Sequence, residues 1–234
     1  MNSIYLRTSS GKMVNILESI KDSNSIYEYF QKGENWLPAV LDTFNKSVRY
    51  DDIIKNINKD SVVLDLGANV GLFSLYIKDK CKTVYAVEPT PTHFEILMKL
   101  TEGTNIVPIK AAITDKTEEV PLFKSESNTT QNGLIPIGFA TSLGKVQGYS
   151  MEDLLKYINV DKIDFCKIDI EGYEDSLFRS EKLENSLDKI KEFFIETHGA
   201  YDYVGDKIIE VLSKHNFICK RPEKDIVLAE KKYE

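Results

Sequence analysis

From residue 61 onward, short apolar runs alternate with amphipathic segments. The runs predict strands over 61–66, 83–88, 105–110, 163–169, 190–197, 217–221 and 225–230, and the segments between them predict helices over 71–80, 91–101, 151–158, from about 174, and over 203–215. This alternation is typical of a parallel sheet with right-handed crossovers. The last two strands are joined only by Pro222–Lys224, too short for a crossover, so we expect them to pair antiparallel. The predicted fold is an α/β, Rossmann-like domain: a seven-stranded, mostly parallel sheet with helices on both faces and one antiparallel strand.

The N-terminal part of the chain follows a different pattern. Residues 1–59 carry helical patterns over Ser25–Gln31 and Leu37–Asn56, separated by polar breaks. We interpret 1–59 as a helical extension or lid, and 60–234 as the main domain.

The middle of the chain interrupts the alternation. Ala111–Phe123 predicts a short strand pair around Asp115–Lys116. Residues 124–148 are rich in turn-forming side chains and poor in periodic apolar ones, which predicts a long loop of the kind that is either functional or disordered. The next predicted helix begins after Ser150, which is a good N-cap because Asp153 follows three residues later.

Composition narrows the class of protein. The 234 residues carry a formal net charge of -7, which opposes the basic surface expected of a nucleic-acid binder. Cys81, Cys166 and Cys219 lack C-x-x-C spacing and predict free, buried thiols. No apolar stretch approaches the roughly 18 residues of a membrane span, and no signal-peptide core is present at the N-terminus. We expect a soluble, cytoplasmic protein that acts on a small molecule; the sequence does not indicate an oligomeric state.

The most informative motif is a glycine-rich turn between a strand and a helix. Asp65, Gly67, Asn69 and Gly71 form the pattern D-x-G-x-N-x-G after an apolar run. At such a junction, backbone N–H groups and the helix dipole face a ligand at the carboxyl edge of the sheet. Glycine lets a ligand approach closely, and asparagine tolerates a left-handed backbone better than most residues.

An acidic residue after the next strand suggests which ligand the turn serves. Glu88 follows Asp65 by 23 positions, and a carboxylate at about this spacing commonly holds ribose hydroxyls. The motif lacks the glycines that a dinucleotide fingerprint needs, since Asn69 and Leu72 stand at those positions. An adenosine-containing ligand is therefore expected, and nicotinamide dinucleotide is disfavoured.

Candidate site residues follow the strands at one edge of the predicted sheet. Asp65, Glu88, Ala112, Asp169 and His198 all lie at expected strand ends, which the doubly wound topology brings together. Asp65 either accepts the N–H groups of the turn or reaches the cofactor amino group through water. The small side chains at Ala111 and Ala112 either suit an adenine face or fill a strand.

Charged residues spaced by two mark the ends of two further strands. Lys167, Asp169 and Glu171 would point to one side of an extended chain, and Glu196 and His198 repeat this spacing. These groups either form a salt-bridged network or act on a substrate. In the second interpretation, His198 or Asp169 is the general base, and Glu171 orients the substrate that accepts the transferred group. We prefer His198 over His93 and His215, because those two lie within helical patterns.

The same residues raise the question of a metal. Asp169, Glu171, Glu196 and His198 offer an oxygen-rich set with one imidazole, which suits Mg²⁺ or Mn²⁺ better than structural Zn²⁺. The sequence alone does not favour this alternative, so no residue is assigned as a metal ligand.

Taken together, the motifs resemble the FkbM family of class I methyltransferases. The resemblance covers about residues 60–200 and rests on four stretches of sequence: Val63–Gly71, Val87–Pro89, the D-x-E-G-x-E pattern within Lys167–Glu174, and Ile195–His198. Tyr173 stands where a small residue is more usual, and Lys110 where a polar uncharged residue is common.

The resemblance implies an S-adenosylmethionine-dependent enzyme with the class I methyltransferase fold. It implies that the cofactor is held by Asp65, Gly67, Ala68, Asn69, Gly71, Glu88, Pro89, Ala111, Ala112 and Asp169, and that Asp169, Glu171 and His198 carry catalysis. The implied reaction is O-methylation of a hydroxyl on a sugar-type or natural-product small molecule. The alternative is a scaffold or sensor that binds the cofactor without chemistry.

Overall fold

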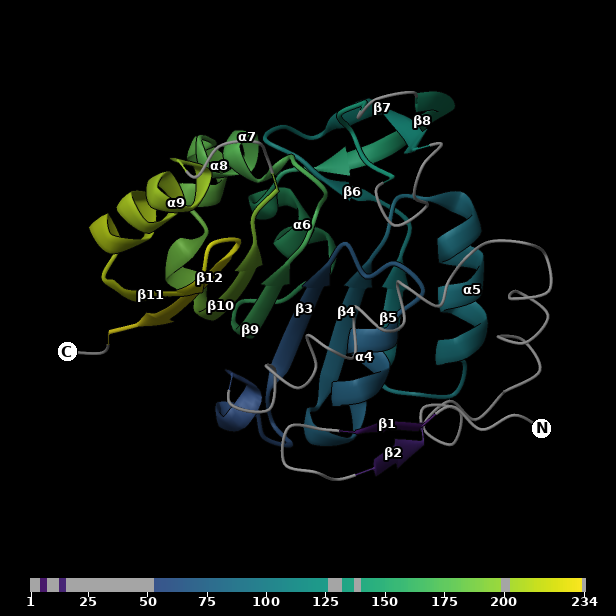
Figure 1. Cartoon of the computed structure of the whole chain (residues 1–234), viewed down its shortest axis with the longest axis horizontal. Coiled ribbons are helices and arrows are strands. Elements are labelled where there is room, and N and C mark those ends of the chain that lie inside the picture. The colour runs from purple at the N-terminus through teal and green to yellow at the C-terminus, as the bar shows by residue number, and fades with distance from the viewer. Residues whose placement is uncertain are drawn as a thin grey trace.

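The computed structural model describes residues 53–125, 132–136, 140–198 and 203–232, together with the backbone of 5–7 and 13–15. Its centre is a seven-stranded sheet (Figure 1). In chain order the strands are β3 (Val62–Leu66), β4 (Thr83–Val87), β5 (Ile106–Ile109), β9 (Ile163–Ile168), β10 (Ile190–Glu196), β11 (Phe217–Glu223) and β12 (Ile226–Lys231). The seven strands lie close to the predicted positions.

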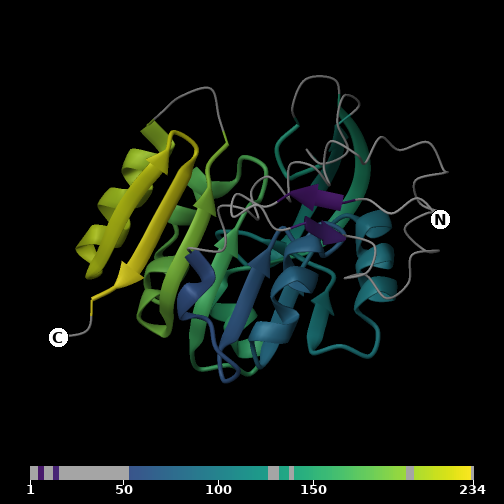
Figure 2. The ribbon, with the colours of Figure 1, turned by 60° about the horizontal axis from the view of Figure 1, so that its bottom comes forward.

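The strand order confirms the predicted topology. The order across the sheet is β11-β12-β10-β9-β3-β4-β5, and the four contacts among β10, β9, β3, β4 and β5 are parallel. Only β12 is reversed, because it pairs antiparallel with both β10 and β11. Figure 2 shows β11 and β12 at one edge of the sheet, beside α9. This is the arrangement that the resemblance to class I methyltransferases implies.

Helices cover both faces of the sheet, as the sequence predicted. Val63 and Phe165 pack with α4 (Leu72–Ile77) and α5 (Pro91–Thr101) in one core. Leu64 and Cys166, the next residues along the same two strands, pack on the opposite face. That second core contains side chains of α6 (Met151–Tyr157), α7 (Glu174–Phe178), α8 (Glu181–Glu184) and α9 (Tyr203–Lys214). Because both faces are buried, β3 and β9 are nearly continuous apolar runs interrupted by a few charges.

Short 3₁₀ segments complete the helical content. They are η1 (Ile54–Asn56), η2 (Lys78–Lys80), which prolongs α4, and η4 (Leu187–Lys189), which leads into β10. The predicted cap at Ser150 is confirmed, since its hydroxyl accepts the Asp153 N–H at 3.3 Å and donates to the Asp153 carboxylate at 2.8 Å. This cap fixes the start of α6.

A second sheet stands above the carboxyl ends of the central strands (Figure 1). It contains β6 (Ala112–Ile113), β7 (Glu118–Ser125) and β8 (Ala140–Tyr149) in the order β6-β8-β7. The predicted strand pair around Asp115–Lys116 was wrong, because β6 and β7 both pair with β8 and not with each other. The predicted loop over 124–148 was also wrong for 124–125 and 140–148, which lie in β7 and β8. Residues 141–145 of β8 are exposed, so this half of the strand lacks the apolar alternation that marks a half-buried strand.

The N-terminal predictions fall mostly on residues that the structure does not describe. Within residues 1–52, it describes only the backbone of β1 (Tyr5–Arg7) and β2 (Met13–Asn15), which pair antiparallel. The helix expected over Ser25–Gln31, most of the one over Leu37–Asn56, and the lid itself lie outside the described residues. No helix in the described ranges is long and apolar enough to cross a membrane. All three cysteines are free; Cys81 and Cys166 are buried and Cys219 is partly exposed.

Candidate active site

The turn after β3 is shaped by close contact with the end of β9. Gly67 has φ +76°, and a Cβ built on it would lie 1.8 Å from the backbone oxygen of Asp169. Asn69 (φ 54°) and Gly71 (φ 87°) are also left-handed, which confirms the expectation for Asn69. The N–H groups of Gly67 and Ala68 both donate to the Val87 carbonyl at 3.0 Å. The turn therefore holds β3, β4 and β9 together at the carboxyl edge of the sheet.

Asp65 is buried beneath this turn. Its Oδ2 accepts a hydrogen bond from Ser74 Oγ at 2.6 Å, and its Oδ1 lies 3.5 Å from Lys167 Nζ. Asp65 and Lys167 are register partners on adjacent strands, so their side chains share one face. Burial raises the pKa of Asp65, against the charge of Lys167 and the Ser74 hydrogen bond. The N–H of Asn69 in this turn donates to Glu88 and not to Asp65.

Glu88 directly follows β4 and is only 4% exposed. Its Oε2 accepts the Asn69 N–H at 2.9 Å and its Oε1 accepts the Thr90 N–H at 2.8 Å. His93 Nδ1 lies 3.6 Å from Oε1. Burial acts to raise the pKa of Glu88, but His93 and the hydrogen bonds of Thr90 outweigh it, so the pKa lies below its usual value. Glu88 is therefore a fixed, ionised carboxylate that connects the glycine turn to the start of α5.

The end of β9 differs in detail from the prediction. The strand ends at Ile168, and Glu171 (φ 54°) and Gly172 (φ 99°) form a left-handed turn. The strict two-residue alternation expected as far as Glu171 was therefore wrong. Lys167 Nζ lies 3.1 Å from Asp169 Oδ2 and 3.5 Å from the Gly67 carbonyl. The turn nevertheless brings Glu171 back beside Asp169.

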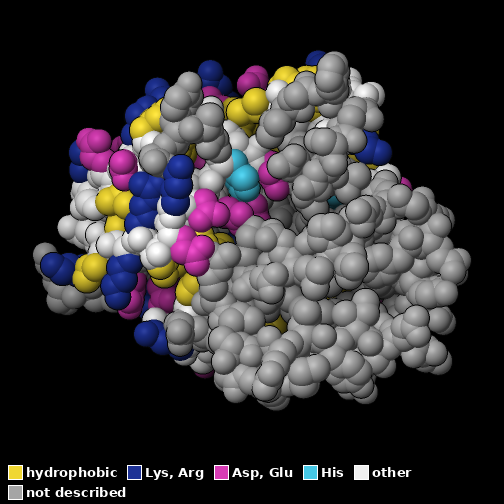
Figure 3. Space-filling model, viewed as in Figure 1, with side chains coloured by type: hydrophobic (Ala, Val, Ile, Leu, Met, Phe, Trp, Pro, Cys, Tyr) yellow, Lys and Arg dark blue, Asp and Glu magenta, His cyan; other side chains and the backbone are white. Residues whose placement is uncertain are grey.

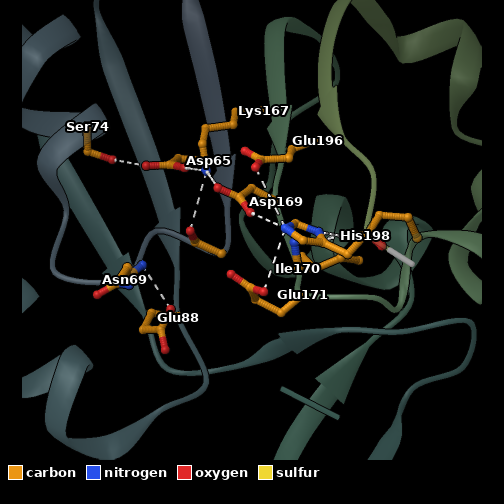
Figure 4. Close-up of polar contacts among 12 residues, drawn as sticks. Asp65, Asn69, Ser74, Glu88, Lys167, Asp169, Ile170, Glu171, Glu196 and His198 are labelled. Atoms are coloured by element: carbon orange, nitrogen blue, oxygen red, sulfur yellow. Dashed lines mark hydrogen bonds and ion pairs between the residues drawn. The ribbon is translucent and has the colours of Figure 1, made fainter. Parts of the chain in front are cut away.

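One imidazole lies among four carboxylates beyond this turn. His198 Nε2 is 3.7 Å from Asp169 Oδ1, 3.6 Å from Glu171 Oε2 and 3.7 Å from Glu196 Oε1, and Nδ1 is 2.9 Å from Glu174 Oε1. We call these five residues the His198 cluster. Figure 4 shows the imidazole facing Asp169, Glu171 and Glu196, and in Figure 3 acidic side chains gather beside a histidine in a hollow of the surface. The charged strand ends that the sequence singled out thus come together.

The charges in the His198 cluster shift each other's proton affinity. Burial lowers the pKa of His198, but the hydrogen bond and charge of Glu174, with the charges of Glu171 and Asp169, raise it to about 10. Burial, helped by the neighbouring carboxylates, raises the pKa of Glu171 to about 8. The proton affinity of the ring is high because the carboxylates of Asp169, Glu171 and Glu174 act on it together. The surrounding carboxylates therefore favour the protonated form of the imidazole.

Glu174 is the functional candidate that the sequence analysis missed. It is the last residue of the D-x-E-G-x-E pattern and the first of α7, and it is fully buried. Its Oε1 also accepts the N–H groups of Ile170 and Gly172, both at 3.3 Å. Glu174 therefore fixes both the turn and the imidazole ring. A glutamate that follows a glycine turn and starts a helix was the available signal.

The remaining predicted residues occupy buried positions around the turn. Ala68, Ala111 and Ala112 are buried in the cores, with Ala112 in β6 and paired with β8, while Pro89 is partly buried. Of the departures from the family pattern, Lys110 is exposed. Tyr173 donates a hydrogen bond to Asp115 Oδ1 at 2.6 Å, which ties the Glu171 turn to the second sheet.

The sequence of the chain matches a known protein family. Residues 65–219 match the methyltransferase FkbM domain, from the aspartate of the glycine turn to β11. The chain belongs to the FkbM family of methyltransferases. Residues 65–219 of this FkbM protein thus form a methyltransferase domain, as the motifs at the four strand ends predicted.

The individual proteins that the chain resembles share little sequence identity with it. The FkbM chain is similar to a curated protein described as trigger factor from Mycoplasma mobile, with 23% identity over 225 residues that cover 90% of this chain and 46% of that protein. The chain therefore spans about half the length of the curated relative it matches. Among solved structures, it is similar to an rRNA methylase from Streptococcus thermophilus (14% identity, TM-score 0.49, covering 79% of this chain and 95% of that one). It is also similar to a putative methyltransferase from Streptococcus mutans in complex with SAH (12% identity, TM-score 0.47, covering 75% and 91%).

Proposed function

We propose that this chain transfers the methyl group of S-adenosylmethionine to a hydroxyl group of a sugar-type or natural-product small molecule. The observation that carries the proposal is the position of Asp169. Its backbone oxygen touches the glycine turn, its Oδ2 lies 3.1 Å from Lys167, and its Oδ1 faces His198. One residue thus joins the turn that would hold the cofactor to the His198 cluster.

On the cofactor side, the proposal gives each turn residue a role. The turn from Gly67 to Gly71 would pass beneath the methionine part of the cofactor, and Ala111 and Ala112 would face the adenine. Glu88 would accept hydrogen bonds from both ribose hydroxyls. Each of its oxygens already accepts one backbone N–H, and a carboxylate oxygen has room for a second donor.

On the acceptor side, the His198 cluster provides what O-methylation needs. A hydroxyl must lose its proton as its oxygen attacks the methyl group, and a positioned base accelerates such steps by about 10²–10⁴-fold. Asp169 and Glu171 place carboxylate oxygens on two sides of His198 Nε2. We assign them the proton-accepting role, and we assign His198 the role of orienting the acceptor oxygen. Much of the remaining acceleration would come from holding the two substrates in line.

The charge of the site bears on the class of acceptor. Acidic side chains surround His198, and the whole chain carries a net charge of -7. A polyanionic nucleic acid would be repelled from such a site, whereas proteins that bind it present a basic surface. A neutral, hydroxyl-rich acceptor meets no such repulsion and can donate hydrogen bonds to the carboxylates.

A direct test is to offer labelled S-adenosylmethionine with matched panels of acceptors. The panels contain sugars and polyols, phenolic natural products, primary amines of similar size, and RNA. We expect S-adenosylhomocysteine to form with a hydroxyl panel, and mass spectrometry to locate a methyl ether. Transfer only to amines or RNA would contradict the proposal. Cofactor binding without transfer to any panel would favour a non-catalytic binder.

Glu88→Gln tests the cofactor side. The variant keeps the shape of the side chain but loses the negative charge and one acceptor oxygen, so we expect the Kd for S-adenosylmethionine to rise about tenfold or more, the scale of one or more lost hydrogen bonds to a charged group. The measurement is isothermal titration calorimetry. Glu210→Gln, in the exposed part of α9, is the control and should bind like the unmodified protein. Equal affinity in all three proteins would remove Glu88 from the cofactor site.

A further inference from the structure

We infer that the His198 cluster binds a divalent metal ion of the Mn²⁺ class, with His198, Asp169 and Glu196 as ligands and Glu171 beside them. The sequence did not favour this alternative, and the spacing in the structure changes the balance. One ligand atom from each of His198, Asp169 and Glu196 lies within 4.8 Å of the others. Two of the three ligands are carboxylates and one is an imidazole, a set that suits Mn²⁺ and related divalent ions.

The distances around Nε2 fit an ion better than hydrogen bonds. The three carboxylate oxygens lie 3.6–3.7 Å from Nε2, beyond the roughly 2.7–3.2 Å of an N–H···O hydrogen bond. Metal–ligand bonds of about 2.0–2.2 Å place neighbouring ligand atoms about 3–3.6 Å apart. A cation between Nε2 and these oxygens would need only small movements of the side chains.

The other ring nitrogen supplies an independent observation. Nδ1 lies 2.9 Å from Oε1 of Glu174, a carboxylate that is fully buried and also accepts two backbone N–H groups. In protein metal sites, a ligating histidine commonly donates its other N–H to such a carboxylate, which fixes the tautomer and aims the free nitrogen at the ion. His198 is held in this way, with Nε2 directed at Asp169, Glu171 and Glu196 (Figure 4).

The electrostatics of the site are consistent with a cation. Asp169 uses Oδ2 for Lys167 and turns Oδ1 toward His198, so one of its oxygens faces the centre of the cluster. Glu196 is 5% exposed, and its Oε1 lies 3.7 Å from the same ring nitrogen, so it also faces the centre of the cluster. The carboxylates attract a doubly charged ion in place of the imidazole proton. This inference rests on the proposed function only for the use of the ion. With His198 and Asp169 engaged as ligands, the ion would take over the orienting role and acidify the acceptor hydroxyl, and Glu171 beside the ligands would accept the proton.

The test measures metal binding in the absence of any acceptor. The full chain is stripped with chelator and titrated with Mn²⁺, following heat by calorimetry and the loss of free Mn²⁺ by electron paramagnetic resonance, with Mg²⁺ as a competitor. We expect one Mn²⁺ per chain. His198→Gln and Glu196→Gln should each weaken binding at least tenfold. Glu174→Gln should weaken it about 10–100-fold through loss of orientation.

His215→Gln is the matched control, because His215 also lies 3.6 Å from a glutamate but outside the cluster. It should leave Mn²⁺ affinity within about twofold of the unmodified protein, well below the effect expected for an orienting carboxylate. Thermal melts with and without S-adenosylhomocysteine check that each variant is folded. Failure of the unmodified chain to take up millimolar Mn²⁺, or binding that His198→Gln and Glu196→Gln leave unchanged, would overturn the inference. Methyl transfer to hydroxyls in excess chelator would contradict the use of the ion in the reaction and leave the proposed function intact.

Discussion

Replacing Gly67 with alanine is expected to abolish cofactor binding and to destabilise the fold. The new Cβ would lie 1.8 Å from the Asp169 backbone oxygen, so either β9 or the turn has to move. The left-handed φ of +76° adds a cost of its own, about 1–3 kcal/mol for a residue with a side chain. We therefore expect the free energy of unfolding to fall by more than about 3 kcal/mol, measured by urea denaturation.

Gly103→Ala separates the two causes. Gly103 has a similar φ of +71°, but nothing lies within 4 Å of the Cβ that alanine would add. In this control the free energy of unfolding should fall only by the cost of the left-handed backbone, about 1–3 kcal/mol, and S-adenosylmethionine should bind normally. If the two variants lose the same stability and both retain the cofactor, then the contact between the turn and Asp169 does not shape the site.

The second large effect is expected for Asp169→Asn. This change keeps the size of the side chain and its contact with the turn, but removes the charge that lies between Lys167 and His198. With the acceptor found in the panels, we expect kcat to fall by about 10²–10⁴-fold, the range of a lost acid–base group. The Kd for S-adenosylmethionine should change much less, because the backbone that contacts the turn is retained.

Asp175→Asn is the matched control for this variant. Asp175 lies nearby in α7, but its carboxylate pairs with exposed Arg179 at 2.7 Å. Exposed pairs of this kind contribute about 0–1 kcal/mol to stability, so neither folding nor turnover should change much. Equal turnover by Asp169→Asn and the unmodified enzyme would exclude Asp169 from the chemistry.

The sequence predicted best where local pattern and burial agree. Helix α5 has the predicted bounds, since Pro91 is pre-set for a first helical turn and the apolar period is regular. The strand β8 was missed because half of its residues are exposed in one run, and because its pairing partners are distant in sequence. Local pattern carries no signal for an exposed strand of this kind.

The sequence predicted the candidate site only in part. Motif spacing placed Asp169, Glu171 and His198 at one edge of the sheet, because parallel strands end together there. It missed Glu174, whose contact with His198 depends on the position of α7. Motif spacing also carries no information on the proton affinity of His198, because the pKa depends on the summed charges of Asp169, Glu171 and Glu174 around the ring. The topology of the sheet determines which of these residues lie close together. The orientation and charge of the His198 ring depend in addition on the three-dimensional packing around it.

We expect the glycine turn and Glu88 to hold S-adenosylmethionine. The most direct measurement is a calorimetric titration of the purified chain with S-adenosylmethionine and S-adenosylhomocysteine, with NAD as the control ligand. The account predicts that both sulfur ligands bind at one site per chain and that NAD does not. Binding of NAD alone, or of none of the three, would contradict it.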